Sequence, residues 1–268
     1  MIHYHGTPCG GTREEAARFL SGRHALIPWQ RNEDLGAAAD FCDSFCFDNS
    51  AFTAWKSGQP ITNWRGYYEW CLEWYRHPGF AFAIIPDVID GSADDNDRMM
   101  TEWYKHVLPC VQCAPVWHLH ESTDRLRHLC ETHRLMRVCL GSSGDYSEPG
   151  TLKWWNRIAE AMKVACDEQG RPIARLHGLR MLDPAIFHRL PLASADSTNA
   201  VRNGSNFSRY GTYIPPTSGQ RQSVNGWRIE SHQSAAVWVP MTAQPVLAFE
   251  LERQSVLELK AATADREE

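Results

Sequence analysis

The hydrophobic pattern of the chain is a rhythm of short apolar runs separated by longer amphipathic stretches, with polar residues directly after most runs. Short runs bounded by polar, Gly or Pro residues are typical of buried strands. The predicted strands are Ile2–His5, His24–Pro28, Phe45–Phe47, Phe80–Pro86, Pro115–Leu119, Met136–Leu140, Ala174–Leu179 and Leu192–Ala195.

Helix signals occupy the stretches between these runs. Thr12 and Glu15 have the spacing of a capping box and precede apolar residues at helical spacing. The stretch 63–76 also has helical spacing, and the aromatic-rich stretch Trp55–Trp74 is predicted to pack in the core. Further helices are predicted over 94–107, 123–133 and 151–169, with a short one starting at Asp183-Pro184.

Alternating strands and helices predict parallel strands joined by crossover helices. The 268 residues suit one (β/α)8 TIM barrel, which has ~250 residues, and 43% hydrophobic residues are enough for a core. We predict an α/β fold with the barrel over residues 1–200; an open doubly wound sheet is the alternative. Residues 201–268 are predicted as a loop-rich C-terminal extension of the same domain, with a long loop over Ser197–Arg228 and a closing helix around Phe249–Leu259.

Composition narrows the functional classes. A net charge of −5 argues against a protein that binds nucleic acid over its whole surface. The longest apolar run, 80–86, is far shorter than the ~18 residues of a membrane span. The first residues lack a signal-peptide pattern. The nine cysteines include only one C-x-x-C, Cys110 to Cys113, so we expect reduced structural cysteines in a cytoplasmic protein.

Polar residues follow the strands where a parallel barrel carries its active site, at the carboxyl ends. One acid at such a place is often the N-cap of the next helix. Three acids and several histidines together predict a catalytic site instead. The set contains Asp48, Asp87 and Asp196, with His118, His120 and His177 at other strand ends.

The order of these motifs resembles the tRNA-guanine transglycosylase family, including phage and bacterial relatives that act on DNA. The resemblance covers roughly residues 40–206. Phe47-Asp48-Asn49-Ser50-Ala51-Phe52 resembles the family's Asp-Ser-Gly-Gly-Phe element, and Ile85-Pro86-Asp87 resembles its base-reading acid. Leu140-Gly141-Ser142-Ser143-Gly144 resembles its Gly-rich turn, and Asp196 to Arg202-Asn203-Gly204 is similar to the segment of its nucleophile.

The resemblance implies base exchange on a nucleic acid, with a free 7-deazaguanine as the incoming base and no cofactor. Asp196 would be the nucleophile that forms a covalent intermediate, and Asp48 the general acid/base. Asp87, His120, Gly141 and Ser142 would bind the base. His120 stands where the family has a base-reading Gln, which is a departure.

Two further departures concern the substrate. The tRNA enzymes hold a structural zinc with three Cys and one His after the eighth strand, whereas this chain has no cysteine beyond Cys166. The chain is also much shorter than those enzymes. We therefore expect no metal, and we favour DNA over tRNA as the polymer.

A cationic stretch supports a nucleic-acid partner. Residues 197–228 contain no Asp or Glu. Their arginines are predicted to hold the phosphates beside a flipped nucleotide, and an ordinary solvated loop is the alternative reading. These residues are Arg202, Arg209, Arg221 and Arg228.

Two other functions compete. The first is a metal-dependent amidohydrolase, in which histidines of the first, fifth and seventh strands and Asp196 would bind a water-activating metal. Its ligands would come from His3, His5, His118 or His120, His177 and Asp196. The second is a nucleic-acid-binding subunit without catalysis, which the net charge of −5 disfavours.

Overall fold

In the computed structural model, which describes residues 1–133, 136–202 and 218–240, parallel strand segments form one sheet. Their order is β5-β4-β3-β2-β1-β9-β8-β7-β6. The strands are β1 (Ile2–Gly6), β2 (His24–Pro28), β3 (Ser44–Asp48), β4 (Phe80–Ile84), β5 (Cys113–Ala114), β6 (Val116–His118), β7 (Arg137–Gly141), β8 (Arg175–Gly178) and β9 (Ser194–Ser197).

The sheet closes on itself at Pro115. β5 and β6 are the two ends of the strand order, yet only this residue separates them in the chain. Proline has no amide N–H, so the hydrogen-bond ladder is interrupted there. The Ile85 amide still donates to the Ala114 carbonyl, and the Cys139 amide to the Pro115 carbonyl, each at 2.9 Å. The two segments therefore occupy one strand position, and the fold is the predicted TIM-barrel-like fold rather than an open sheet.

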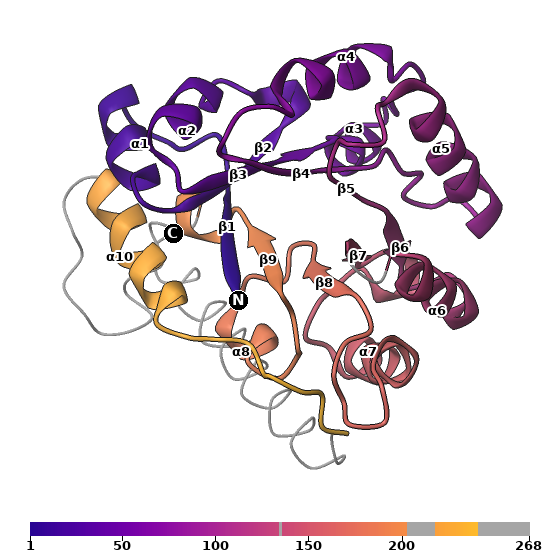
Figure 1. Cartoon of the computed structure of the whole chain (residues 1–268). Helices are drawn as coiled ribbons and strands as arrows, with labels where there is room; N and C mark the ends of the chain where they lie inside the picture. Colours follow the sequence, from indigo (N-terminus) through magenta and orange to yellow (C-terminus); the bar gives the residue numbers. More distant parts are fainter. Residues whose placement is uncertain (134–135, 203–217, 241–268) are drawn as a thin grey trace, which may run out of the picture.

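Helices surround the strands (Figure 1). The capping box is confirmed, because the Glu15 amide donates to Thr12 Oγ1 and the Thr12 amide to Glu15 Oε2. The helices before β9 are α1 (Arg13–Leu20), α2 (Leu35–Phe41), α3 (Ala51–Lys56), α4 (Arg65–Trp74), α5 (Ala93–His106), α6 (Thr123–Thr132), α7 (Leu152–Ala165) and α8 (Pro184–Phe187), with 3-10 turns η1 (Trp29–Arg31) and η2 (Gly144–Tyr146).

Helix α7 ends earlier than predicted. The sequence pattern extends to Gln169, but the helix stops at Ala165. The Asp167 carboxylate accepts hydrogen bonds from the Gln169 and Arg171 amides, at 3.0 and 2.8 Å. An Asp side chain that binds nearby amides in this way stabilises a turn in competition with the helix.

The core has two layers separated by the strands. Inside the barrel, Tyr4, Leu26, Cys46, Phe82 and Cys139 pack together. Outside it, a larger set that includes Phe45, Phe47 and Trp70 packs between strands and helices. Phe47 and Trp70 stack with ring centroids 3.6 Å apart. Core packing is confirmed for the buried part of the aromatic-rich stretch, which includes Tyr67 and Trp70, whereas Trp55 at its start is exposed. Successive residues of a strand therefore point alternately into the barrel and towards the helices.

The predicted long loop over Ser197–Arg228 is wrong in two described parts. Asn199–Arg202 forms helix α9 and Ser218–Glu230 forms helix α10. The buried residues of α10 include Gln222, Asn225 and Gly226, so the sequence shows little apolar periodicity. Helix α10 lies beside α1 and β1 (Figure 1). Arg209 and the predicted closing helix fall outside the described residues.

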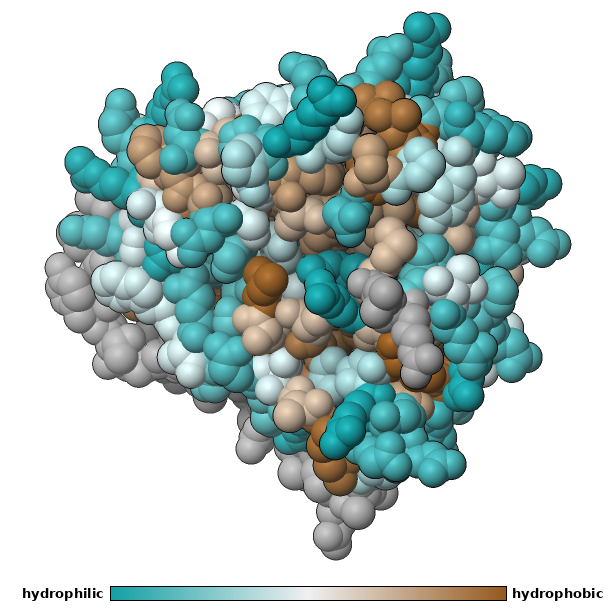
Figure 2. Space-filling model, in the orientation of Figure 1, coloured by the Kyte–Doolittle hydropathy of each residue, from teal (hydrophilic) through white to brown (hydrophobic). Residues whose placement is uncertain are grey.

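One face of the molecule is mostly hydrophilic, with small groups of apolar residues (Figure 2). None of the helices in the described ranges is both long enough and apolar enough to span a membrane.

Candidate active site at the barrel rim

Strand register directs two of the three predicted acids into the barrel. Asp196 on β9 pairs with Tyr4 on β1, and Tyr4 belongs to the interior core. Asp48 ends β3 two residues after Cys46, another interior residue, and so lies on the same face. Asp87 lies three residues beyond the end of β4. All three come from the carboxyl ends of strands, as predicted.

The three acids are near enough to interact electrostatically. Burial, together with the negative charges of Asp196 and Asp87, raises the pKa of Asp48 to about 7. Backbone hydrogen bonds from Ser50 and Asn49 oppose the rise. The buried thiol of Cys139 below them feels all three carboxylates, and its pKa is raised mainly by burial. One acid of the group is therefore poised to carry a proton near neutral pH.

Asp87 is held by two neighbouring side chains. Asn49 Nδ2 donates to Asp87 Oδ1, and His118 Nε2 lies at hydrogen-bond distance from Asp87 Oδ2, both at 2.8 Å. Asn49 also donates to the Ile85 carbonyl and accepts from the Ala51 amide. The turn after β3 is thus tied to the end of β4, and the Asp87 carboxylate is fixed in direction.

Asp196 has a different environment. Its Oδ1 accepts a hydrogen bond from the Arg180 amide at 3.2 Å, and His177 Nε2 lies 3.3 Å from the same oxygen. The Arg180 guanidinium donates to the carbonyl of Ser142 and lies over the Phe52 ring, 4.2 Å from its centroid. Arg180 therefore connects the predicted nucleophile to the turn after β7 and to helix α3, which follows β3.

Gly141 and His118 are neighbours across β7 and β6. A Cβ atom at Gly141 would lie 2.9 Å from His118 Nδ1, so only glycine fits without a shift. His118 Nδ1 is buried and has no hydrogen-bond partner among the described residues. A buried polar nitrogen without a partner is costly and often marks a ligand position.

The other predicted base-binding residues are engaged within the protein. His120 Nδ1 contacts Ser143 Oγ at 2.7 Å and its Nε2 contacts the Gly91 carbonyl at 2.8 Å. Ser142 Oγ accepts from Trp154 Nε1 at 2.9 Å. His118, rather than His120, is the histidine in contact with Asp87.

The predicted phosphate-binding arginines do not form one loop. Arg202 is the last residue of α9. Arg221 and Arg228 lie on α10, seven residues apart and so about 10 Å apart along the helix axis. Gln222, beside Arg221, donates to the carbonyl of Gly10, in the loop after β1 on the rim side.

The metal site of the amidohydrolase alternative is not assembled. His3 and His5 flank the inward-facing Tyr4 and point out of the barrel, towards the last turn of α10 and the residues after it. His3 Nε2 contacts the His232 carbonyl and His5 Nε2 contacts Glu230, at 3.0 and 2.7 Å. In the described ranges, no three His, Cys, Asp or Glu side chains are grouped to hold a metal ion.

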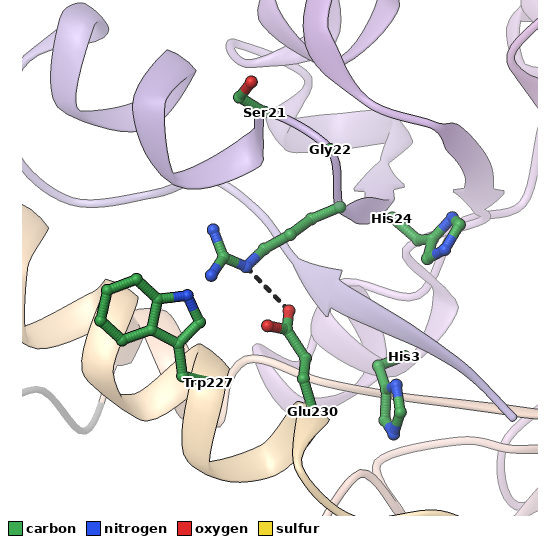
Figure 3. A pocket seen from close by; sticks show the side chains of 7 residues that line it. His3, Ser21, Gly22, His24, Trp227 and Glu230 are labelled. Carbon is green, nitrogen blue, oxygen red and sulfur yellow. Dashed lines mark hydrogen bonds and ion pairs between the residues drawn. The ribbon is translucent and has the colours of Figure 1, made fainter.

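A cavity of about 390 Å³ lies beside this outer cluster (Figure 3). Its lining includes Ser21, Gly22 and Arg23, which precede β2 and so lie at the end of the barrel opposite the acids. Arg23 Nε donates to Glu230 Oε1 at 2.7 Å across it. The cavity is therefore separate from the acid group.

Sequence reasoning missed the roles of Asn49 and Arg180, and it placed His177 in the polar set at the strand ends but gave it no specific role other than that of a metal ligand. Asn49 and Arg180 directly follow strand ends or lie within a few residues of them, which is the signal that selected the acids. Arg180 also has φ +58°, a left-handed conformation that no sequence pattern indicates for arginine.

No protein-family model matches the chain, and no curated protein is significantly similar to it.

Proposed function

We propose that this protein is a base-exchange glycosyltransferase that replaces guanine in a nucleic acid, DNA rather than tRNA, with a free 7-deazaguanine base. The observation that carries the proposal is the group of three coupled carboxylates, in which Asp48 has its pKa raised to about 7 by burial and by the charges of Asp196 and Asp87. We place this activity on DNA in the cytoplasm.

The chemistry requires three carboxyl groups with different roles. In the first step Asp196 attacks C1′ of the guanine nucleotide, the C1′–N9 bond breaks, and the leaving guanine takes a proton from Asp48. In the second step the incoming base loses its N9 proton to Asp48, its N9 attacks C1′, and Asp196 is released. A pKa of about 7 lets Asp48 both donate and accept this proton near neutral pH.

Asp87 suits recognition of the base. A guanine-like ring presents N–H donors on its N1 and exocyclic amine edge, and carboxylate oxygens accept such bonds. Asn49 and His118 fix the carboxylate and leave acceptor positions on both oxygens. The geometry supports His118 in place of His120 as the histidine beside the base.

The backbone at Ser50 also supports the resemblance. Ser50 has φ +65°, the left-handed region that favours glycine. It aligns with the first Gly of the family's Asp-Ser-Gly-Gly-Phe element. The chain therefore makes at Ser50 the kind of turn for which that motif uses glycine.

The test is incubation of the protein with DNA or tRNA and a radiolabelled 7-deazaguanine. We expect label in DNA with the wild-type protein and none with Asp196→Asn. A denaturing gel of the quenched reaction should show a covalent protein–DNA adduct only for the wild type.

Incorporation of label only into tRNA would show that the polymer substrate is tRNA and not DNA. A folded protein that labels neither polymer across several 7-deazaguanines, and that forms no adduct, would overturn base exchange. DNA binding without exchange would then favour the non-catalytic binding subunit.

A further inference from the structure

A line of buried polar groups runs through the barrel interior to Asp196. Arg137 Nη1 donates to Ser194 Oγ at 2.8 Å, and Ser194 Oγ contacts His177 Nδ1 at 2.8 Å. His177 Nε2 then lies 3.3 Å from Asp196 Oδ1. Ser194 and His177 are completely buried. Asp196 is the only member of this line that takes part in the proposed exchange, and Arg137, Ser194 and His177 lie behind it.

The hydrogen-bond pattern determines the tautomer of His177. The guanidinium of Arg137 only donates, so Ser194 Oγ accepts from it and its single hydroxyl proton points elsewhere. Among the described residues, His177 Nδ1 is the one remaining partner of Ser194 Oγ, so it accepts that proton. The opposite tautomer, with Nδ1–H donating to the second lone pair of Ser194 Oγ, would leave the hydroxyl proton without an acceptor and would turn the Nε2 lone pair towards the Asp196 carboxylate. Burial lowers the pKa of His177, so the ring is neutral and its one N–H is on Nε2. This N–H faces Asp196.

Within the part of the chain that the structure describes, the Nε2–H has no other acceptor. The Tyr4 and Phe82 rings pack edge-on against the imidazole, with centroids 6.0 and 5.4 Å away. Nε2 is buried and lacks a well-formed hydrogen bond among the described residues, although Asp196 is within 3.3 Å. A contact of this length in a substrate-free site can tighten when the reacting groups are brought together.

We propose that His177 is the positioning residue of the nucleophile: its Nε2–H, held by Ser194 and Arg137 behind it, directs the Asp196 carboxylate towards C1′. This inference rests on the proposed function. His177 itself touches no substrate, because Asp196 lies between it and the rim. The Arg180 amide fixes the same carboxylate from the rim side.

Three substitutions at one position separate this role from simple packing. His177→Gln places an amide N–H near the position of Nε2, whereas His177→Asn is shorter and His177→Leu has no donor. We expect the rate of adduct formation in a single turnover to fall by ~10²-fold in the Asn and Leu variants and much less in the Gln variant. The KM for DNA should stay within about twofold in all three. Equal loss in the three variants, or a loss confined to KM, would overturn the proposal.

Ser194→Ala is a milder test if the variants at His177 fail to fold. It removes the proton donor to Nδ1 and lets the ring adopt the other tautomer. We expect a smaller fall in adduct rate than in His177→Leu and no change in the KM for DNA. An unchanged rate would contradict the chain of positioning groups.

A direct readout does not depend on activity. Nitrogen-15 NMR of the wild-type protein should show a neutral His177 with the proton on Nε2, and its Nε2–H signal should shift in Asp196→Asn. A proton on Nδ1, or a signal insensitive to Asp196, would overturn the proposal even in an active enzyme. An inactive wild type with the expected NMR result would instead show that base exchange is wrong while the His177–Asp196 contact stands.

Discussion

Two groups of histidines and carboxylates lie on the same barrel and differ in how their charges are balanced. Outside the barrel, Glu230 contacts both His5 and Arg23 at 2.7 Å. Inside the rim, the charges of Asp87 and Asp196 act on Asp48, and the Arg180 guanidinium interacts with Asp196. The two groups contain similar residue types, yet the pKa of Glu230 is lowered whereas the pKa of Asp48 is raised.

The difference depends on whether neighbouring positive groups offset the effect of burial on each carboxylate. Burial alone would raise the pKa of Glu230, but hydrogen bonds from His5 and Arg23 outweigh it and lower the pKa to about 2. The Asp48 side chain is half-buried and its neighbours are negative, so its pKa rises to about 7. A compensated group stabilises the fold, whereas an uncompensated one costs stability and is typical of functional sites. We therefore expect mutations at the rim to affect catalysis and mutations at the outer cluster to affect stability.

The largest expected effect is at Asp196. Asp196→Asn should reduce base exchange by at least about 10⁴-fold, because an amide is isosteric but a poor nucleophile. DNA affinity, measured by fluorescence anisotropy, should change little. Asp124→Asn, an exposed acid in the first turn of α6, is the control and should exchange bases normally. Full activity in Asp196→Asn would assign the nucleophile to another residue.

Asp48→Asn should lower exchange by about 10²–10⁴-fold through loss of proton transfer. Because the folded pKa of about 7 lies above the usual 3.8, the protonated form favours folding. The stabilisation of the fold by protonated Asp48 is fully present below about pH 4 and is lost as pH rises through about 7. The substitution should therefore raise Tm at pH 8 relative to wild type and remove the change in rate near pH 7. A Tm of Asp48→Asn below that of the wild type at pH 8 would contradict the claim that the charge of Asp48 is uncompensated in the folded protein.

Glu230→Gln should destabilise the fold by about 1–3 kcal/mol in urea unfolding at pH 7, because it leaves His5 and Arg23 without their carboxylate. The folded pKa of about 2 lies below the usual 4.5. The stabilisation is thus present above pH 4.5 and is lost as pH falls towards 2. Base exchange at saturating substrate should be unaffected. Glu33→Gln, which breaks an exposed pair with Arg31, is the matched control and should change stability little.

The smallest effect is expected at Arg221, on the turn of α10 nearest the rim. Arg221→Ala should reduce the slope of log affinity for DNA against log salt by about 0.7–0.9, the value for one lost phosphate contact. Arg228→Ala, farther along α10, should change the slope less. Equal slopes in all three proteins would remove α10 from the nucleic-acid interface.

Much of the fold was predictable because local signals agreed with it. Each predicted strand overlaps an observed one, and the capping box at Thr12 begins α1 as expected. Helix α10 was not predictable, since its buried face uses Gln222, Asn225 and Gly226 in place of an apolar stripe. Gly226 fits because a Cβ there would lie 3.1 Å from the Phe19 ring.

The sequence by itself determined where the strands and six of the helices before β9 lie, and that acids follow the third, fourth and eighth strand positions. Only the tertiary structure decided which side chains face each other. Both faces of a parallel barrel strand are buried, so the sequence does not show which set points inward. Register places His177 and Asp196 inside and His3 and His5 outside. The pKa of Asp48 was likewise decided in three dimensions, because its cause is burial and two charges from strands distant in the chain.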